Sequence, residues 1–237
     1  MTTLLLRFAG PLQSWGASSR FTVRATRREP TKSGVLGLIA AAQGRRRSDP
    51  IEDLLQLKVG VRVDQPGTLL RDFQTARNDK GKSMPLSNRY YLTDAVFVVG
   101  IEGEAGLIEG IQNALKRPRY PLYLGRRSCP PSFPLVLKTV DKPLNKALLP
   151  ESVEWQAAPW FTKRVARKGY VADLVSDSND FGDGNEHELE ETVRDVPISF
   201  DMRNRQYSWR TVYRSSVTLC DPPQQVAHDP LLELEDA

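Results

Sequence analysis

One stretch of the chain, YPLYLGRRSCP, combines side chains that grip phosphates with side chains that stack on bases. Gly125 permits a tight backbone path that brings main-chain N–H groups close to a ligand. Arg126 and Arg127 end in rigid guanidinium forks that suit phosphate oxygens. Tyr120 and Tyr123 offer flat faces on which an unpaired base can stack. Together these residues predict contact with a nucleic-acid backbone, and with a single strand more than with a duplex.

Taken alone, the same stretch fits equally well a connection from a helix to a strand that carries charged surface residues. The distribution of charge favours the binding interpretation, although the formal net charge of the 237 residues is only +4. Residues 1–47 hold nine basic residues and one acidic residue, and residues 116–138 hold six basic residues and no acidic one. Residues 173–195 hold nine acidic residues against one arginine. Local basic surface of this kind attracts a polyanion whatever the total charge.

Two N-terminal segments are further candidates for phosphate contacts. The segment RFTVRATRR alternates basic residues with others, and its second interpretation is a solvated edge strand whose charges resist aggregation. The segment PTKSG opens a predicted helix, where free N–H groups favour an anion. The candidate ligands in these two segments are Arg20, Arg24, Arg27, Arg28, Lys32 and Ser33.

Two later segments are also basic and aromatic. The polar insert at 67–93 is either a flexible surface loop or a hairpin that wedges against a strand of RNA, and its candidate ligands are Arg71, Arg77, Arg89 and Tyr90. A C-terminal cluster combines Arg203, Arg205, Arg210 and Arg214 with Tyr207, Trp209 and Tyr213. That cluster fits arginines stacked on aromatic rings at least as well as it fits a binding surface.

The residue types give little support for catalysis or for metal binding. Metal-free RNA cleavage usually needs a histidine as general acid or base, and the two histidines fall in the acidic segment (His187) and in the predicted tail (His228). Cys129 and Cys220 cannot form a structural zinc site by themselves. The acidic residues at 180–188 fit no EF-hand spacing. We therefore predict no catalytic residue, no metal and no cofactor.

The N-terminus lacks the basic region and long apolar stretch of a signal peptide. No apolar run approaches the roughly 20 residues that span a bilayer. We expect a soluble cytoplasmic protein with reduced cysteines and no membrane partner.

Apolar runs and periodic patterns predict the elements that position these residues. Strands are expected at 2–8, 57–63, 94–101 and 133–140, and helices at 34–43 and 106–116. The resulting order, β-α-β-β-α-β, is the ferredoxin-like pattern shared by RNA-recognition modules, so the predicted class is α+β. After residue 141 we expect strands at 160–165, 169–175, 196–200 and 207–219, with a loop at 176–191.

Three blocks of the sequence together resemble a known protein family. They are LRFAGPLQSWG at 6–16, RATRREPTKSGVLGL at 24–38 and PRYPLYLGRRSCP at 118–130. In this order they look like the fifth Cas protein family of the RAMP superfamily, in the form found in type I-E CRISPR Cascade complexes. The resemblance covers roughly the first 140 residues well and is thinner beyond them.

The resemblance implies a ferredoxin-like palm over residues 1–142 with a thumb hairpin at 67–93, a small C-terminal β region at 143–220 and a flexible tail at 221–237. It implies a non-catalytic RNA-binding subunit that grips the 5′ handle of the CRISPR RNA. The implied partners are that RNA, the Cascade backbone subunits, the Cascade large subunit and, indirectly, target DNA. By position in the three blocks, the resemblance adds Gln13, Ser14, Trp15, Ser128 and Cys129 to the candidate RNA ligands Tyr123, Gly125, Arg126 and Arg127.

Two alternatives stay open at this point. Some relatives in type I-C systems are endoribonucleases that process precursor CRISPR RNA, so a metal-independent nuclease ranks second. A scaffold that binds only proteins ranks third, because it would leave the basic segments without an anion.

Overall fold

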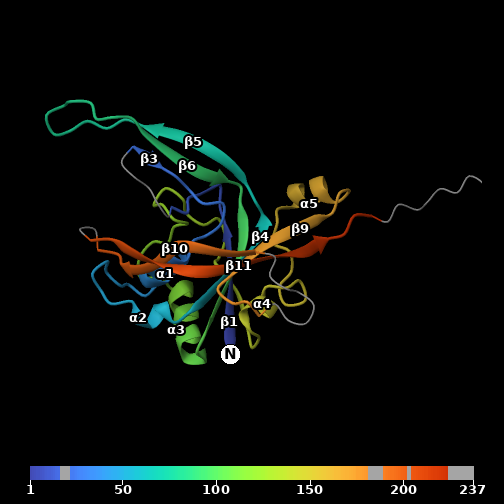
Figure 1. Ribbon diagram of the computed structural model, residues 1–237. Coiled ribbons are helices and arrows are strands. Elements are labelled where there is room, and N and C mark those ends of the chain that lie inside the picture. The colour runs from blue at the N-terminus through green and yellow to red at the C-terminus, as the bar shows by residue number, and fades with distance from the viewer. Residues whose placement is uncertain (17–21, 181–188, 202–203, 224–237) are drawn as a thin grey trace, which may run out of the picture.

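The computed structural model describes residues 1–16, 22–180, 189–201 and 204–223. Over these residues the chain mixes helices and strands, with more sheet than helix (Figure 1), which confirms the predicted α+β class. Of what was discussed above, Arg20, His187, Arg203 and His228, the acidic residues at 181–188 and residues 224–237 of the predicted tail lie outside the described ranges. Within the described ranges, every helix is too short or too polar to cross a lipid bilayer.

The elements predicted for the first 142 residues are all present. They are β1 (Thr2–Ala9), α1 (Lys32–Ala42), β4 (Lys58–Gln65), β7 (Val96–Gly103), α3 (Ala105–Lys116) and β8 (Val136–Val140). The strands lie in the order β4-β7-β1-β8, and each neighbouring pair is antiparallel. β8 begins later than predicted, after Pro134, because proline has no N–H to donate to a sheet.

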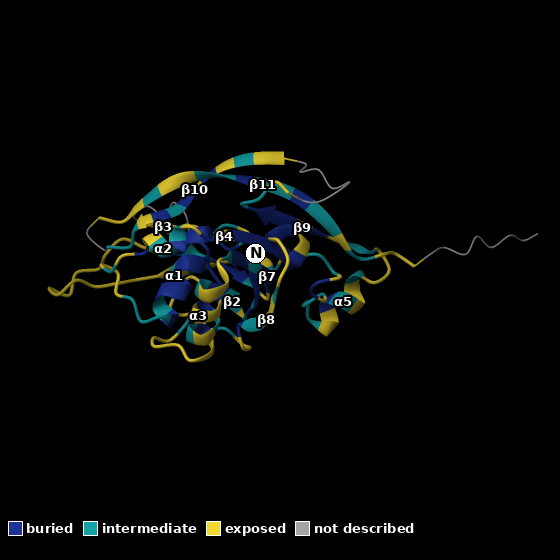
Figure 2. Cartoon of the chain, turned by 90° about the horizontal axis from the view of Figure 1, so that it is seen from below, coloured by how far each residue is buried: buried dark blue, intermediate teal, exposed yellow. Residues whose placement is uncertain are grey.

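The central strands bury side chains on both faces of the sheet. Leu4, Leu6 and Phe8 of β1 face a core shared with α1 and α3. Leu5 faces the opposite side, in a smaller cluster with α4 (Leu144–Ala147). This alternation follows from the two-residue period of a strand. Buried residues gather in β4, β7 and α1 (Figure 2), so these elements form the rigid centre of the fold.

The insert at 67–93 forms a projecting β-hairpin. Its strands β5 (Thr68–Gln74) and β6 (Ser87–Thr93) pair in antiparallel register, and the hairpin extends away from the main sheet (Figure 1). β6 also pairs with β2 (Leu12–Gln13) and with β3 (Val23–Arg24). The N-terminal basic segment and the hairpin are therefore joined in one small sheet, which sequence periodicity did not predict.

The C-terminal strands extend the main sheet. They are β9 (Tyr170–Ser176), β10 (Leu189–Ser199) and β11 (Gln206–Cys220), and β9 pairs with β4 to give the order β10-β11-β9-β4-β7-β1-β8. The loop predicted at 176–191 therefore ends earlier than expected, because residues 189–191 already pair with β11.

Two short helices were missed, and one predicted strand is wrong. The missed helices are α2 (Glu52–Leu55) and α4. The strand predicted at 160–165 is instead helix α5 (Pro159–Val165). Pro159 occupies the first turn, where a missing N–H costs nothing, and Phe161 packs edge-on against Trp155 and Tyr170. Aromatic packing on one side of a helical turn therefore decides the conformation of this segment.

Candidate nucleic-acid interface

The glycine–arginine stretch forms a loop that is fastened to the end of β2. The Leu124 amide donates to the carbonyl of Cys129 (2.7 Å), and the Ser14 amide donates to the carbonyl of Leu124 (3.1 Å). Leu124 and Cys129 are fully buried, and burial raises the pKa of the Cys129 thiol above its ordinary value. Gly125 has φ +88°, and a Cβ there would overlap the Ser14 carbonyl oxygen. Only glycine fits this close approach without strain.

Arg126 joins this loop to the small sheet. Its Nη2 donates to the carbonyl of Arg24 (2.9 Å), and its Cζ lies 4.7 Å from the centroid of the Tyr91 ring. Burial alone would raise the pKa of the Tyr91 hydroxyl, but hydrogen bonds with Arg126 and Ser128 and the nearby positive charge lower it overall. Among the described residues, Nη1 of Arg126 has no hydrogen-bond partner. Nη1 is itself shielded from solvent, so the guanidinium is held in place as a fixed positive charge beside the groove.

A groove of about 920 Å³ runs between α1 and the loop at 120–130. Small residues of α1 (Gly34, Gly37, Ala40 and Ala41) line one wall and keep it open. The groove is also lined by five aromatic residues, namely Trp15, Tyr120, Tyr123, Phe200 and Tyr207. Six arginines complete the lining, namely Arg45, Arg46, Arg47, Arg126, Arg127 and Arg205, and no described lining residue is acidic.

The arginines of the groove differ in their freedom. Arg45 forms a bidentate pair with Asp53, and this hydrogen bonding lowers the pKa of the Asp53 carboxyl. Arg46, Arg47 and Arg127 are exposed. Within the described part of the chain, no ion pair neutralises Arg46, Arg47 or Arg127, so their positive charge is available along the mouth of the groove.

Three predicted ligands from the first sequence block, Gln13, Ser14 and Trp15, form hydrogen bonds and ring contacts within the protein behind the wall of the groove. Gln13 is fully buried, and its Nε2 donates to the carbonyls of Phe8 (3.2 Å) and Ala95 (2.7 Å). Its Oε1 accepts from Nε1 of Trp15 (3.2 Å), whose indole stacks on Phe8. The Ser14 hydroxyl donates to the carbonyl of Tyr90 (3.0 Å). These side chains position the groove, and Ser14 and Trp15 also line it.

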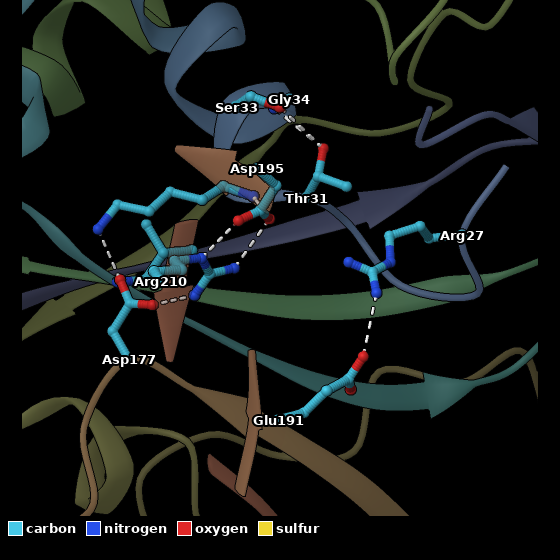
Figure 3. A network of polar contacts seen from close by, with 10 residues as sticks. Arg27, Thr31, Ser33, Gly34, Asp177, Glu191, Asp195 and Arg210 are labelled. Atoms are coloured by element: carbon cyan, nitrogen blue, oxygen red, sulfur yellow. Dashed lines mark hydrogen bonds and ion pairs between the residues drawn. The ribbon is translucent and has the colours of Figure 1, made fainter. Parts of the chain in front are cut away.

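The start of α1 already holds an anion, supplied by the chain itself (Figure 3). The Lys32 amide donates to Oδ2 of Asp195 (2.8 Å), and its ammonium donates to Oδ2 of Asp177 (2.7 Å). Arg210 lies between the same two carboxylates. Burial would raise the pKa of Asp195, but hydrogen bonds and the charge of Arg210 lower it overall. We expected an external anion at this helix start, but the carboxylates of Asp195 and Asp177 occupy it.

The remaining basic residues before α1 divide in the same way. Ser33 lies beside the capping Thr31 (3.3 Å between hydroxyls) and lines the groove. Arg27 pairs with Glu191 (3.2 Å), while Arg24 and Arg28 are exposed. Part of the acidic segment thus neutralises basic residues of this chain.

The predicted C-terminal aromatic–basic cluster is likewise split. Arg214 pairs with Glu29 (2.8 Å) and Glu191 (2.9 Å), and Arg210 pairs as described above, so both meet carboxylates rather than aromatic rings. Arg205 and Tyr207 instead line the groove. The interface therefore includes residues from the far end of the chain.

The predicted hairpin ligands lie at two distances from the groove. Arg89 contacts the Tyr91 hydroxyl, on the face of β6 that meets Arg126. Tyr90 accepts from the Ser14 hydroxyl through its main-chain carbonyl, and its side chain belongs to the opposite face of the strand. Arg71 bonds to Asn88 along the hairpin (3.1 Å), and Arg77 is exposed near its tip. Sequence reasoning did not select Arg45, Arg46, Arg47 or Phe200, although the run of three arginines after α1 was a signal that could have pointed to the first three. It did predict Tyr120 as a stacking face, and it weighed Arg205 and Tyr207 as part of a possible binding surface.

The fold and this groove define an α+β protein with a basic, aromatic groove, and comparison with known proteins identifies its family. A family model described as "CRISPR-associated protein (Cas_Cas5)" matches residues 3–213, so the chain belongs to this family of CRISPR-associated proteins. A curated relative, the "CRISPR system Cascade subunit CasD" of Escherichia coli (strain K12), is 38% identical over 168 residues. That alignment covers 62% of this chain and 75% of the relative.

Two solved structures are similar over nearly the whole chain. One, titled "CRISPR RNA-guided surveillance complex", aligns with a TM-score of 0.68 and 30% identity, and covers 99% of this chain and 100% of that one. Another, titled "Crystal structure of Cas protein", has a TM-score of 0.65 and 36% identity, and covers 92% and 95% of the two chains. The similarity therefore extends to the C-terminal strands, where the sequence blocks were thin.

Proposed function

We propose that this chain is a non-catalytic, RNA-binding subunit of a type I-E CRISPR surveillance complex, and that it grips the 5′ handle of the CRISPR RNA. Similarity to CasD and to a chain of an RNA-guided surveillance complex supports the proposal that this chain is a subunit of such a complex. The observation that carries the RNA assignment is the groove at 120–130, which combines arginines and aromatic rings with no described acidic lining residue. Such a combination suits a single strand, because cations follow the phosphates while bases stack on rings.

Each group in the groove has a part in this proposal. Arg126, held by Arg24 and Tyr91, adds a fixed positive charge to the lining of the groove at little further cost in side-chain entropy. Arg127 is exposed beside it and adds a second cation. Tyr120 and Tyr123 supply the stacking faces. Gln13 and Trp15 support the wall of the groove, and Lys32 is engaged by Asp177 and Asp195 rather than by the RNA.

The remainder of the fold supports the same assignment. The antiparallel order β4-β7-β1-β8 with α1 and α3 in one core supports a ferredoxin-like palm. The β5–β6 hairpin has the shape of a thumb, and its exposed length is available to the backbone and large subunits of the complex. We place such an RNA-guided complex in the cytoplasm, where Cys129 and Cys220 would stay reduced.

The arginine pair provides the test of this proposal. In a complex assembled with the Arg126→Ala, Arg127→Ala variant, we expect retention of CRISPR RNA to fall about tenfold, because two charge-assisted contacts are lost. The slope of log affinity against log salt should become shallower by about 1.4, as expected for two fewer phosphate contacts to a single strand. The matched control is Lys116→Ala, Arg117→Ala, which removes the same charge from exposed residues outside the groove. Equal RNA content in the two complexes would contradict the proposal.

The non-catalytic part needs its own assay. Incubation of the purified chain with labelled precursor repeat RNA, with and without EDTA, should leave the RNA intact. A defined product in both reactions would instead favour a metal-independent endoribonuclease that processes precursor CRISPR RNA.

A further inference from the structure

Helix α5 belongs to an aromatic cluster that the RNA groove does not use. The rings of Trp155 and Tyr170 stack with centroids 5.4 Å apart, and Phe161 meets both rings edge-on. Trp160 packs edge-on against Phe161 (5.8 Å between centroids) and keeps 51% of its surface exposed. Such a cluster holds the exposed indole in a fixed orientation.

The same cluster is fastened to the end of β4. Nε1 of Trp155 donates to the carbonyl of Asp64 (2.8 Å), and the Tyr170 hydroxyl donates to the carbonyl of Val63 (2.8 Å). The Ala158 amide, at the start of α5, donates to Oε1 of Gln65 (3.1 Å). Burial, together with the nearby acidic residues, raises the pKa of Tyr170, so its hydroxyl stays a donor. α5 is therefore a rigid platform at the base of the β5–β6 hairpin.

The exposed side of this platform is strongly basic. Residues 155–169 hold four basic residues and no acidic one, and all four are exposed. Lys163 and Arg164 lie in α5, and Arg167 and Lys168 follow it directly; we call these four residues the cations of α5. Arg164 lies over the rings of Trp160 (5.1 Å) and Phe161 (5.2 Å). Over the described part of the chain, no ion pair involves any of these four cations. In this they differ from Arg27, Arg210 and Arg214, whose charges are neutralised by carboxylates.

This basic surface is separate from the groove. α5 lies well away from α1 in both views of the molecule (Figures 1 and 2), whereas the groove runs along α1. No residue of α5 lines the groove. A ligand on α5 would therefore contact the chain at a second, independent place.

We propose that Trp160 and the cations of α5 bind the phosphate backbone of a single-stranded nucleic acid, with one unpaired base stacked on the exposed indole. A half-exposed ring fixed among unpaired cations is the arrangement that suits a single strand. An acidic protein partner fits less well, because the cores of protein interfaces are poor in lysine and need a larger apolar area than one indole. The shared chemistry admits a ribose or a deoxyribose strand, and the experiment includes both.

The test measures binding of fluorescently labelled oligouridine and oligothymidine of equal length to the full chain by fluorescence anisotropy. The variant Lys163→Gln, Arg167→Gln, Lys168→Gln spares Arg164, which packs on the rings. Its matched control is Lys116→Gln, Arg117→Gln, Lys138→Gln, which removes the same charge from exposed positions elsewhere. We expect the α5 variant to bind at least one of the two strands about tenfold more weakly than the control, with a salt slope shallower by about 2. If the α5 variant and the control variant bind each of the two strands with the same affinity, the proposal is overturned.

A pair of indole variants tests stacking. Trp160 and Trp209 are both more than half exposed, and each lies near an arginine, Arg164 and Arg194 respectively. Trp160→Leu should weaken binding of a single strand by about tenfold, whereas Trp209→Leu should not. The loss should be smaller for a duplex of equal length, which has no unpaired base to offer. Equal effects of the two substitutions would overturn the stacking contact.

The groove variant separates this proposal from the function proposed above. In the Arg126→Ala, Arg127→Ala background, the α5 variant should weaken binding by the same factor as in the unaltered chain, because the two surfaces do not touch. An α5 effect that disappears in that background would show that α5 is not an independent site. If the Arg126→Ala, Arg127→Ala substitutions leave the affinity unchanged while the α5 variant still binds more weakly, the result counts against the groove and not against the α5 surface. Melting temperatures within a few degrees of the unaltered chain establish that all variants fold.

Discussion

Arg126 illustrates how one side chain can be both part of the fold and part of a binding site. Its guanidinium is fixed by the carbonyl of Arg24 and by the Tyr91 ring, which removes most of its rotamer freedom before any ligand arrives. A side chain ordered in advance loses less entropy on binding than a free surface arginine. The glycine next to it has the complementary role, because it lets the loop approach Ser14 closely enough for Arg126 to reach these partners.

Substitution of Gly125 should separate loop geometry from charge. Gly125→Ala places a Cβ against the Ser14 carbonyl in a left-handed conformation, so we expect a loss of about 2 kcal/mol in the free energy of unfolding and weaker RNA binding. The control is Gly110→Ala in α3, where an added Cβ meets no other atom within 4 Å. That change should stabilise the helix by about 0.5–1 kcal/mol. Denaturant titrations of both variants give the comparison, and an unaffected Gly125→Ala would refute the tight approach.

Individual residues also show the limit of sequence reasoning about the site. Gln13, Trp15 and Lys32 stand in blocks that resemble a family of RNA-binding proteins, yet their side chains are buried and engaged within the chain. A motif marks residues that matter but does not say whether they touch a ligand or support the residues that do. The partners of Lys32, Asp177 and Asp195, are more than a hundred positions away in the sequence, so no local pattern predicts them.

The ion network of Lys32, Asp177, Asp195 and Arg210 joins elements that are distant in the chain. It links the start of α1 to the ends of β9 and to β10 and β11, and all four side chains are largely buried. Removing one member of such a network leaves its partners as uncompensated charges, which costs far more than the pair itself contributes. The network therefore fixes the C-terminal strands on α1, one wall of the groove.

Acid should weaken this junction in a defined direction. The folded-state pKa of Asp195 is below its ordinary value, so its contribution is fully present above the unfolded pKa of about 3.9 and is lost as the pH falls further. Asp195→Asn should cost about 3 kcal/mol at neutral pH. The difference between the unaltered chain and this variant should shrink below about pH 4. Asp53→Asn, at a half-exposed pair, is the control and should cost under about 1 kcal/mol. A difference that stays constant down to the acid limit would contradict the role of Asp195.

Elements were predictable where periodicity was strong and local. The two long helices and the four strands of the first 142 residues have clear apolar patterns, and all are present. Residues 160–165 (WFTKRV) mix apolar and basic residues in a spacing that suits either a strand or a helix, and the contacts of Phe161 with Trp155 and Tyr170 decide between them. The pairing of β6 with β2 and β3, which builds the wall behind the loop, depends on contacts across the fold and was not predictable.

Over the described part of the chain, the basic residues fall into three groups: the N-terminal basic residues, the arginines of the groove and the cations of α5. Two of the nine N-terminal basic residues, Arg27 and Lys32, are neutralised by the described part of the acidic segment. The arginines at the mouth of the groove and the cations of α5 keep their charge free of described ion pairs, apart from Arg45. The small net charge of the chain therefore conceals two regions suited to a polyanion.

Photo-crosslinking of the assembled complex tests most directly whether this groove holds the 5′ handle. CRISPR RNA carrying 4-thiouridine at single handle positions is irradiated within the complex, and the crosslinked peptides are identified by mass spectrometry. If the groove holds the handle, crosslinks should fall within 119–130 and 45–47, and they should be absent from these residues when the label stands in the middle of the guide. Handle labels that crosslink only to other subunits would contradict the assignment.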